Sequence, residues 1–314
     1  MDPDQYCQQK AAASGSSFYY SFLFLPEQRR RAITALYAFC REVDDVVDEV
    51  SETEAARMKV AWWRAEVERL FAGQASHPVA RALSPLLESF DLPREHFHEI
   101  INGMEMDIDH AGYATFADLE TYCWRVASVV GLLSAEIFGY EDAGTRDYAR
   151  DLGMAFQLTN ILRDVREDAM RGRIYIPGED LDAHGVKTGE LLQPSTPDHV
   201  RRLFEAQAHR ARMYYDRAFA ALPSGDRHAQ RSGIIMARIY LTLLDEIERD
   251  GYRVLEHRVA LTPLRKLWIA WRTARSRARS SRRHRATSLG CAGATPCGSK
   301  YPGAISPAMQ GGEA

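Results

Sequence analysis

The chain of 314 residues lacks the short motifs and long apolar runs that identify several large classes of protein. It has no G-x-G-x-x-G turn and no Walker loop, so the usual glycine-rich sites for dinucleotides and nucleoside triphosphates are not predicted. The longest apolar stretch, residues 126–140, is broken by polar side chains and is too short to span a bilayer. The first residues, Met1–Asp4, are acidic and lack the apolar core of a signal peptide, so none is expected.

Cysteine is scarce and scattered as well. No two of the five cysteines form a C-x-x-C pair, and their number is odd. They are Cys7, Cys40, Cys123, Cys291 and Cys297. Such a set predicts reduced thiols in a cytosolic protein rather than a disulfide framework.

Positive charge is in deficit over most of the chain and concentrated at its end. The formal net charge is -3, yet Arg265–Ala314 contains ten basic residues and one acidic residue, so the preceding body is acidic. An acidic body that binds an anionic substrate would need metal ions to invert the local field. The basic segment Arg265–Arg285 could contact anionic membrane lipid, although a solvated tail explains it equally well, and nucleic-acid binding from it alone would be non-specific.

The alternation typical of strands is rare, whereas apolar residues recur at intervals of three and four. This pattern predicts helices over residues 27–50, 51–73, 78–90, 93–109, 116–138, 145–170, 197–222, 227–250 and from 263 onward. The predicted fold class is therefore all-α, a single large helical bundle around a central cavity, with a flap over residues 171–195. Residues 1–275 are predicted to form the catalytic domain, and residues 276–314 a disordered tail because they are too polar to offset the entropy of ordering.

A first polar stripe is predicted on the helix over residues 27–50. Tyr37, Arg41, Asp44 and Asp48 follow one another at steps of four, three and four, which places them on one helix face. Charged side chains are rarely buried without partners, so this face is not an ordinary core face. The alternative is a solvated face with an ion pair between Arg41 and Asp44.

A second stripe lies on the helix over residues 145–170. Gln157, Asn160, Asp164 and Asp168 all carry side-chain oxygens and are spaced by three, four and four residues. Carboxylates four residues apart repel each other in a helix, and Mg²⁺ commonly bridges such carboxylates to substrate phosphates. Arg163 beside this stripe could hold phosphate oxygens. Two such faces opposed across a bundle would make a cage for metal ions and a diphosphate, whereas the alternative is an exposed polar face.

With their flanking residues, these motifs resemble the squalene/phytoene synthase family, the head-to-head trans-isoprenyl diphosphate synthases, over about residues 5–272. The segments that carry the resemblance are Ser14–Tyr20, Leu36–Asp48, Tyr122–Gly131, Gln157–Asp168 and Arg173–Pro177. The opening Tyr6–Tyr20 is similar to the bacterial presqualene diphosphate synthases of hopanoid biosynthesis, the HpnD group.

The resemblance implies an isoprenoid synthase fold and a prenyltransferase that condenses two molecules of farnesyl diphosphate to presqualene diphosphate. The cofactor it implies is Mg²⁺, with Mn²⁺ as a substitute, and no NADPH is expected for this step. Synthesis of phytoene, dehydrosqualene or squalene stays open, as does a non-catalytic, membrane-associated scaffold. We expect a cytoplasmic protein, peripheral on the inner membrane face, whose functional partners act in squalene and hopanoid biosynthesis, with no specific nucleic-acid partner.

The resemblance also implies roles for individual residues. The implied metal ligands are Asp44 and Asp48 at one diphosphate, and Asn160, Asp164 and Asp168 at the other. The residues implied to contact the diphosphates are Ser17, Tyr37, Arg41, Gln157, Arg163, Tyr175 and Tyr240. Tyr122, Val126 and Gly131 match the segment that lines the reacting isoprenoid, and Tyr122 would guide proton loss when the cyclopropane ring closes.

Overall fold

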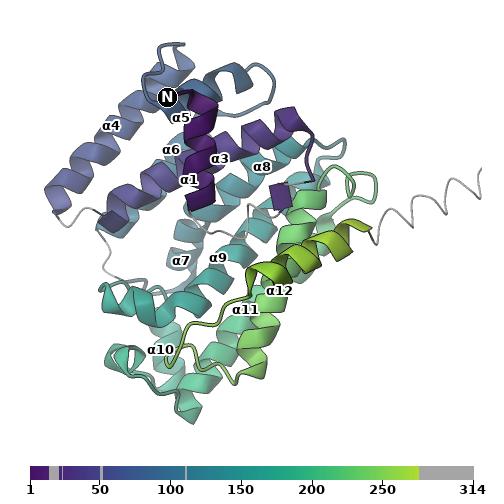
Figure 1. Ribbon diagram of the computed structural model, residues 1–314. Coiled ribbons are helices and arrows are strands. Elements are labelled where there is room, and N and C mark those ends of the chain that lie inside the picture. Colours follow the sequence, from purple (N-terminus) through teal and green to yellow (C-terminus); the bar gives the residue numbers. More distant parts are fainter. Residues whose placement is uncertain (14–20, 23, 50–51, 110–111, 276–314) are drawn as a thin grey trace, which may run out of the picture. The chain divides into compact units, whose positions relative to one another are not determined.

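The computed structural model describes residues 1–13, 21–22, 24–49, 52–109 and 112–275, and the side chains of residues 47–49 are outside the description. Helices account for the regular structure in these ranges, and no residue within them forms a strand (Figure 1). The predicted all-α class is therefore confirmed. The predicted phosphate-binding residue Ser17 and the predicted tail, residues 276–314, lie outside the described residues.

The helices follow the predicted order closely. Their bounds are α1 Pro3–Ala13, α3 Glu27–Glu49, α4 Thr53–Phe71, α5 Pro78–Leu83, α6 Arg94–Ile108, α7 Phe116–Cys123, α8 Val129–Phe138, α9 Gly144–Met170, α10 Gly178–His184, α11 Asp198–Ala221 and α12 Arg231–Arg249. A further helix covers residues 263–275 and is the yellow-green ribbon that bears no label in Figure 1.

The structure adds α1, which was not predicted, and differs from the predicted helices in three further places. The helix predicted over 78–90 stops at Leu83 and continues only as a 3₁₀ turn, η1 Ser84–Leu86, because Pro85 cannot donate a backbone hydrogen bond. The predicted flap contains α10 and a second 3₁₀ turn, η3 Thr188–Leu192. The helix predicted over 116–138 passes through a π-helical turn, η2 Trp124–Ser128, which changes the helical register between α7 and α8.

Two groups of buried apolar side chains form the core. One is built on α3, α4, α5 and α6, where the Phe39 ring meets the edges of Trp63 and Phe97. The other is built on α9, α11 and α12 and includes the fully buried Tyr215 and Phe204. Helix α9 lies centrally and packs against α8, η2, α11 and α12 (Figure 1). These helices all belong to one compact unit, Met1–Ala274.

Glycine allows α9 to approach its neighbours closely. A Cβ atom on Gly131 of α8 would lie 2.4 Å from the carbonyl oxygen of Ala149 on α9. A Cβ atom on Gly153 of α9 would lie 2.5 Å from the carbonyl oxygen of Ala127 in η2. Because these obstacles are backbone atoms, they cannot turn aside as a side chain can, and both positions require glycine.

The described cysteines, Cys7, Cys40 and Cys123, are all free. Burial raises the pKa of the Cys40 thiol to about 12, so this thiol stays protonated at neutral pH. Of the helices that the structure describes, none is both long and apolar enough to cross a membrane.

We expect Gly153→Ala to lower the free energy of unfolding by about 1–3 kcal/mol because the new methyl group overpacks the contact with η2. Alanine is by itself the better helix former, so a loss of stability would identify the clash. The matched control is Gly189→Ala, since a Cβ atom there meets no described atom within 4 Å. Urea unfolding of both variants checks this, and equal stabilities for the two would contradict it.

Candidate functional site

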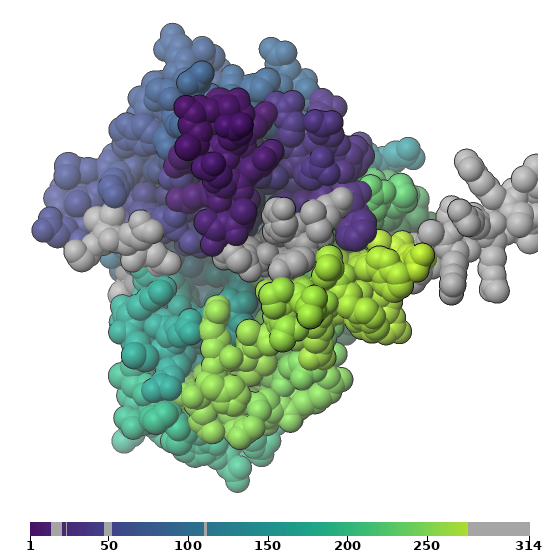
Figure 2. Space-filling model, viewed as in Figure 1, coloured from purple at the N-terminus to yellow at the C-terminus, as the bar shows by residue number. Residues whose placement is uncertain are grey.

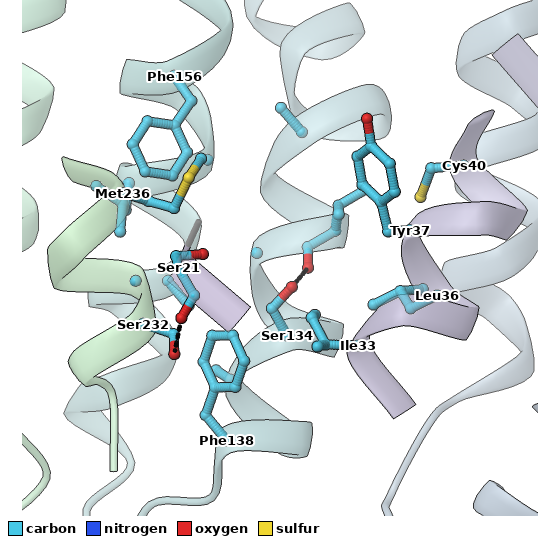
Figure 3. A pocket seen from close by; sticks show the side chains of 18 of the residues that line it. Ser21, Ile33, Leu36, Tyr37, Cys40, Ser134, Phe138, Phe156, Ser232 and Met236 are labelled. Carbon is cyan, nitrogen blue, oxygen red and sulfur yellow. Dashed lines mark hydrogen bonds between the residues drawn. The ribbon is translucent and has the colours of Figure 1, made fainter. Parts of the chain in front are cut away.

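An apolar cavity lies where the two halves of the core meet. Its walls come from α3, η2, α8, α9 and α12, and they include Leu36, Phe138, Phe156 and Met236 (Figure 3). Two serines of the lining use their hydroxyl groups to bond the backbone. Ser134 donates to the carbonyl of Val130 at 2.7 Å, and Ser232 donates to the carbonyl of Ser21 at 3.0 Å. Since these hydroxyl groups are satisfied locally, the wall offers a ligand a mainly apolar surface.

The structure brings five of the predicted site residues to this cavity. They are Tyr37, Val126, Gly131, Gln157 and Asn160. They come from α3, η2, α8 and α9, so residues up to 123 positions apart in the chain share one wall. Their contact with one cavity is a finding of the structure, and their individual roles stay predictions.

Asn160 lies at the polar end of this wall. Its Oδ1 atom is buried and has no hydrogen-bond partner among the described residues. A buried acceptor without a partner costs about 1–3 kcal/mol, so it is suited to a cation or a donor that binds there. Tyr240 is a neighbour of Asn160. The Tyr240 ring lies 4.8 Å from the ring of Phe156. Burial raises the pKa of Tyr240, and the nearby Arg163 opposes this shift.

One turn beyond Asn160, two arginines bond Asp164. Arg163 donates to both Asp164 oxygens, through Nε at 2.7 Å and through Nη2, and Arg258 donates through Nε at 2.8 Å. Burial alone would raise the pKa of Asp164, but these hydrogen bonds outweigh it and the pKa is lowered. Lys266 lies near these two arginines, since burial, followed by the charges of Arg163 and Arg258, lowers the pKa of Lys266. We call Arg163, Arg258 and Lys266 the basic group. Two arginines on one carboxylate, with a lysine near both, can hold an anion with several oxygens, such as a diphosphate.

Arg258 and Lys266 were missed by the sequence reasoning. They lie about one hundred residues after Asp164, in a basic region that gave no local signal of a site. Only the return of the chain across α9 places them beside the second stripe.

Asp168 lies on the next turn of α9. Burial, followed by repulsion from Asp164, raises the pKa of Asp168 to about 7, and Arg171 and Arg173 oppose this shift. A carboxylate under such repulsion gains from a cation, and Asn160 Oδ1, about two turns earlier on α9, is a neutral oxygen of the kind that Mg²⁺ accepts. No three acidic, histidine or cysteine side chains converge on one point in the described part of the chain. Mg²⁺ usually needs only one or two carboxylates besides phosphate and water, so these donors fit the ion.

The first stripe is held by ion pairs within α3. Arg41 bonds Asp44 and Asp45, each at 2.6 Å, so the Arg41–Asp44 pair weighed as the alternative is present. Lys10 of α1 also bonds Asp45, at 2.7 Å, which ties this residue to a neighbouring helix. Asp48 lies in α3, but its side chain is outside the described residues.

Tyr122 and Tyr175 meet at a buried carboxylate rather than in the cavity wall. The Tyr122 hydroxyl donates to Asp107 Oδ2 and the Tyr175 hydroxyl to Asp107 Oδ1, both at 2.8 Å, and the two rings stack at 5.2 Å. Burial, followed by the charge of Asp107, raises the pKa of Tyr122 well above its ordinary value. This group borders the second stripe, since Tyr175 and Asp168 line one small pocket and Asp107 adds to the raised pKa of Asp168.

Asp107 was also missed, although the sequence contains a signal for it. It follows Phe97, Ile100 and Met104 at helical spacing on α6, so a carboxylate interrupts the apolar face of this helix. A charged residue in such a position is rarely buried without a partner, and here the two tyrosines supply the donors.

The chain is similar to proteins of known kind. The profile of the squalene/phytoene synthase family matches residues 11–265. The 15-cis-phytoene synthase of Synechococcus elongatus is 36% identical over 275 residues, which cover 83% of this chain and 89% of the relative. The 15-cis-phytoene synthase of Synechocystis is 35% identical over 280 residues, with 84% and 83% covered.

Two solved structures share the fold. A dehydrosqualene synthase in complex with a ligand superposes with a TM-score of 0.81 at 29% identity, covering 88% of this chain and 97% of that one. The squalene synthase HpnC from Alicyclobacillus acidocaldarius superposes with a TM-score of 0.72 at 30% identity, covering 80% and 94%. These matches confirm the predicted isoprenoid synthase type of bundle. The curated relatives named here are phytoene synthases, so they do not support the narrower prediction of an HpnD-like presqualene diphosphate synthase.

We expect Asp107→Leu to lower the free energy of unfolding by about 2–4 kcal/mol, because the hydroxyl groups of Tyr122 and Tyr175 lose their buried acceptor. Replacing both tyrosines by phenylalanine in the same variant should recover most of this loss. The control is Asp109→Leu two residues away, where an exposed ion pair with Arg57 predicts less than about 1 kcal/mol. Urea unfolding measures all three, and an unchanged stability for Asp107→Leu would contradict the expected burial of this carboxylate.

Proposed function

We propose that this chain, which belongs to the squalene/phytoene synthase family, condenses two allylic prenyl diphosphates head to head. One observation carries the proposal: the apolar cavity reaches Asn160, and one helical turn further on Arg163 and Arg258 bond Asp164, with Lys266 near both arginines. A prenyl diphosphate has the matching form, an apolar tail joined to an anionic head.

In this proposal the cavity wall protects the reacting carbons. Loss of diphosphate with its bonding electron pair leaves an allylic cation, which water would destroy. Residues such as Leu36, Phe138 and Met236 exclude water, and the Phe156 ring offers a π-face to positive charge. The double bond of the second prenyl diphosphate can then attack this cation and form the new carbon–carbon bond.

The basic group holds the head of the substrate. Arg163 and Arg258 are now bonded to Asp164, and their guanidinium groups are suited to bind phosphate oxygens in two-point contacts. Lys266 adds a third positive charge at the same place. These side chains orient the bond that breaks and stabilise the departing anion.

The donor set supports a divalent metal as the cofactor. Asn160, Asp164 and Asp168 on α9, with Asp44 and Asp48 on α3, would hold Mg²⁺, and Mn²⁺ would serve as a substitute. Bound Mg²⁺ supplies charge neutralisation to the leaving diphosphate as a Lewis acid. Asp44 and Asp164 would then exchange their present arginine partners for the ion.

In this proposal Tyr122 takes part in proton loss, as the resemblance to the family implies. Closing a cyclopropane ring requires a carbon to lose a proton, while the electrons of the broken C–H bond form the last ring bond. The Tyr122 hydroxyl already donates to Asp107, so a proton received at the tyrosine oxygen can pass on to this carboxylate.

Two products remain candidates. The similarity of Tyr6–Tyr20 to presqualene diphosphate synthases supports farnesyl diphosphate as substrate and presqualene diphosphate as product, in a route to squalene and hopanoids and without NADPH. The phytoene synthases among the relatives support the alternative, a longer C20 substrate and phytoene. A scaffold without activity is the outcome if neither substrate is converted.

Product analysis distinguishes these candidates. We expect the purified chain with Mg²⁺ and farnesyl diphosphate, without NADPH, to release presqualene diphosphate, detected by mass spectrometry. Chelation of the metal should stop turnover, and added Mg²⁺ or Mn²⁺ should restore it. Recovery of a C40 hydrocarbon from geranylgeranyl diphosphate, with farnesyl diphosphate left unconverted, would instead establish phytoene synthesis.

A second prediction concerns the two stripes. Asp44→Asn and Asp164→Asn should each reduce turnover by about two orders of magnitude or more, because the diphosphate then loses its charge partners. The matched control is Asp147→Asn on the same helix as Asp164, α9, where the carboxylate is 59% exposed and pairs with Arg150. Initial rates, with circular dichroism to confirm the fold, test this, and full activity in both stripe variants would refute the proposed site.

A further inference from the structure

The helix over residues 263–275 presents large apolar side chains to solvent. Leu264 is 80% exposed, and Leu267, Trp268 and Trp271 are each between 43% and 52% exposed. These four are among only ten large apolar side chains that are exposed in the described part of the chain. Figure 2 shows the segment, in yellow-green, at the molecular surface.

The spacing of these residues forms a single stripe. Positions 264, 267, 268 and 271 follow the intervals of three, one and three that keep side chains on one helix face. The opposite face is occupied, because Ile269 and Ala270 are buried in the core. The described residues therefore bury one apolar face of this helix and leave the other largely exposed.

Positive charge borders the exposed stripe. Arg265 and Arg272 are exposed beside it, and the Arg272 guanidinium lies 5.1 Å from the centre of the Trp268 ring. Five more arginines and no acidic residue follow in the sequence from Ser276 to Arg285. Tryptophan and leucine flanked by arginine are the composition of helices that lie in the interface of an anionic bilayer.

We propose that the stripe formed by Leu264, Leu267, Trp268 and Trp271 docks this protein on the surface of an anionic lipid bilayer. The apolar side chains would enter the boundary between headgroups and acyl chains, while the arginines contact the lipid phosphates. A second copy of the chain is a poorer partner for this face, since a twofold contact would bring two identical basic borders together. The proposal does not depend on which product the enzyme makes.

The position of this helix relates the docking surface to the basic group near Asp164. Lys266 lies on the same helix, between the exposed residues Arg265 and Leu267, and its pKa is lowered by burial and by Arg163 and Arg258. A membrane bound to the outer face would therefore lie within one helix diameter, about 10 Å, of the basic group. Apolar substrates and products could then exchange with the bilayer close to the site.

The test is flotation of the full chain with vesicles of phosphatidylcholine containing about one third phosphatidylglycerol, compared with phosphatidylcholine alone. We expect the chain to float with the anionic vesicles, and W268Q/W271Q to reduce the partition coefficient at least about tenfold. The matched control is Trp62→Gln, which changes an exposed tryptophan on α4 and should leave the partition coefficient within about twofold. Turnover in detergent should be the same in all three proteins, so loss of binding is separable from loss of activity.

A second measurement uses the unmodified chain and covers the case of a misfolded variant. Brominated phosphatidylcholine in the anionic vesicles should quench part of the tryptophan fluorescence, and quenching should fall in W268Q/W271Q. Absence of both flotation and quenching for the unmodified chain would overturn the proposal. An equal loss of vesicle binding in Trp62→Gln would also overturn it. So would a wild-type dimer that does not bind vesicles and that W268Q/W271Q converts to a monomer, because the exposed face would then join two copies of the chain.

Discussion

Repulsion between two half-buried carboxylates one turn apart is the constraint on which the site depends. Asp164 and Asp168 share a face of α9, and this helix is enclosed on several sides by others. Such a pair is stable only with positive charge nearby, and the chain supplies it from three separate segments, through Arg163, Arg173 and Arg258. The same positive charge that stabilises the folded protein without ligand is the charge that an anionic substrate would meet.

The cavity beside these charges depends on close packing of glycine against backbone. Gly131 and Gly153 bring α8 and η2 to within van der Waals contact of α9, so main chain forms the cavity wall at these two positions, beside larger apolar side chains such as Phe138 and Phe156. The hydroxyl groups of Ser134 and Ser232 in the lining are bonded to carbonyl groups. An apolar interior and a strongly charged end therefore lie on one helix, separated by about a single turn.

The last described helix serves both regions. Its inner face anchors in the core through Ile269 and Ala270 and brings Lys266 toward Arg163 and Arg258. Its outer face exposes leucine and tryptophan beside arginine. One short segment thus contributes a charge to the proposed diphosphate site and, in our proposal, the contact with the lipid phase in which prenyl chains dissolve.

Sequence periodicity by itself determined the helical class, the order of the helices and the existence of two oxygen-rich stripes, because these properties depend on residues three or four positions apart. It also indicated Tyr37, Gln157 and Asn160, which the structure places at one cavity. The tertiary structure alone decided that Asp107 joins Tyr122 to Tyr175, that Arg258 reaches Asp164 and that Lys266 lies near Arg163 and Arg258. These contacts join residues from fifteen to more than ninety positions apart, and such contacts arise from the packing of whole helices, which local spacing does not encode.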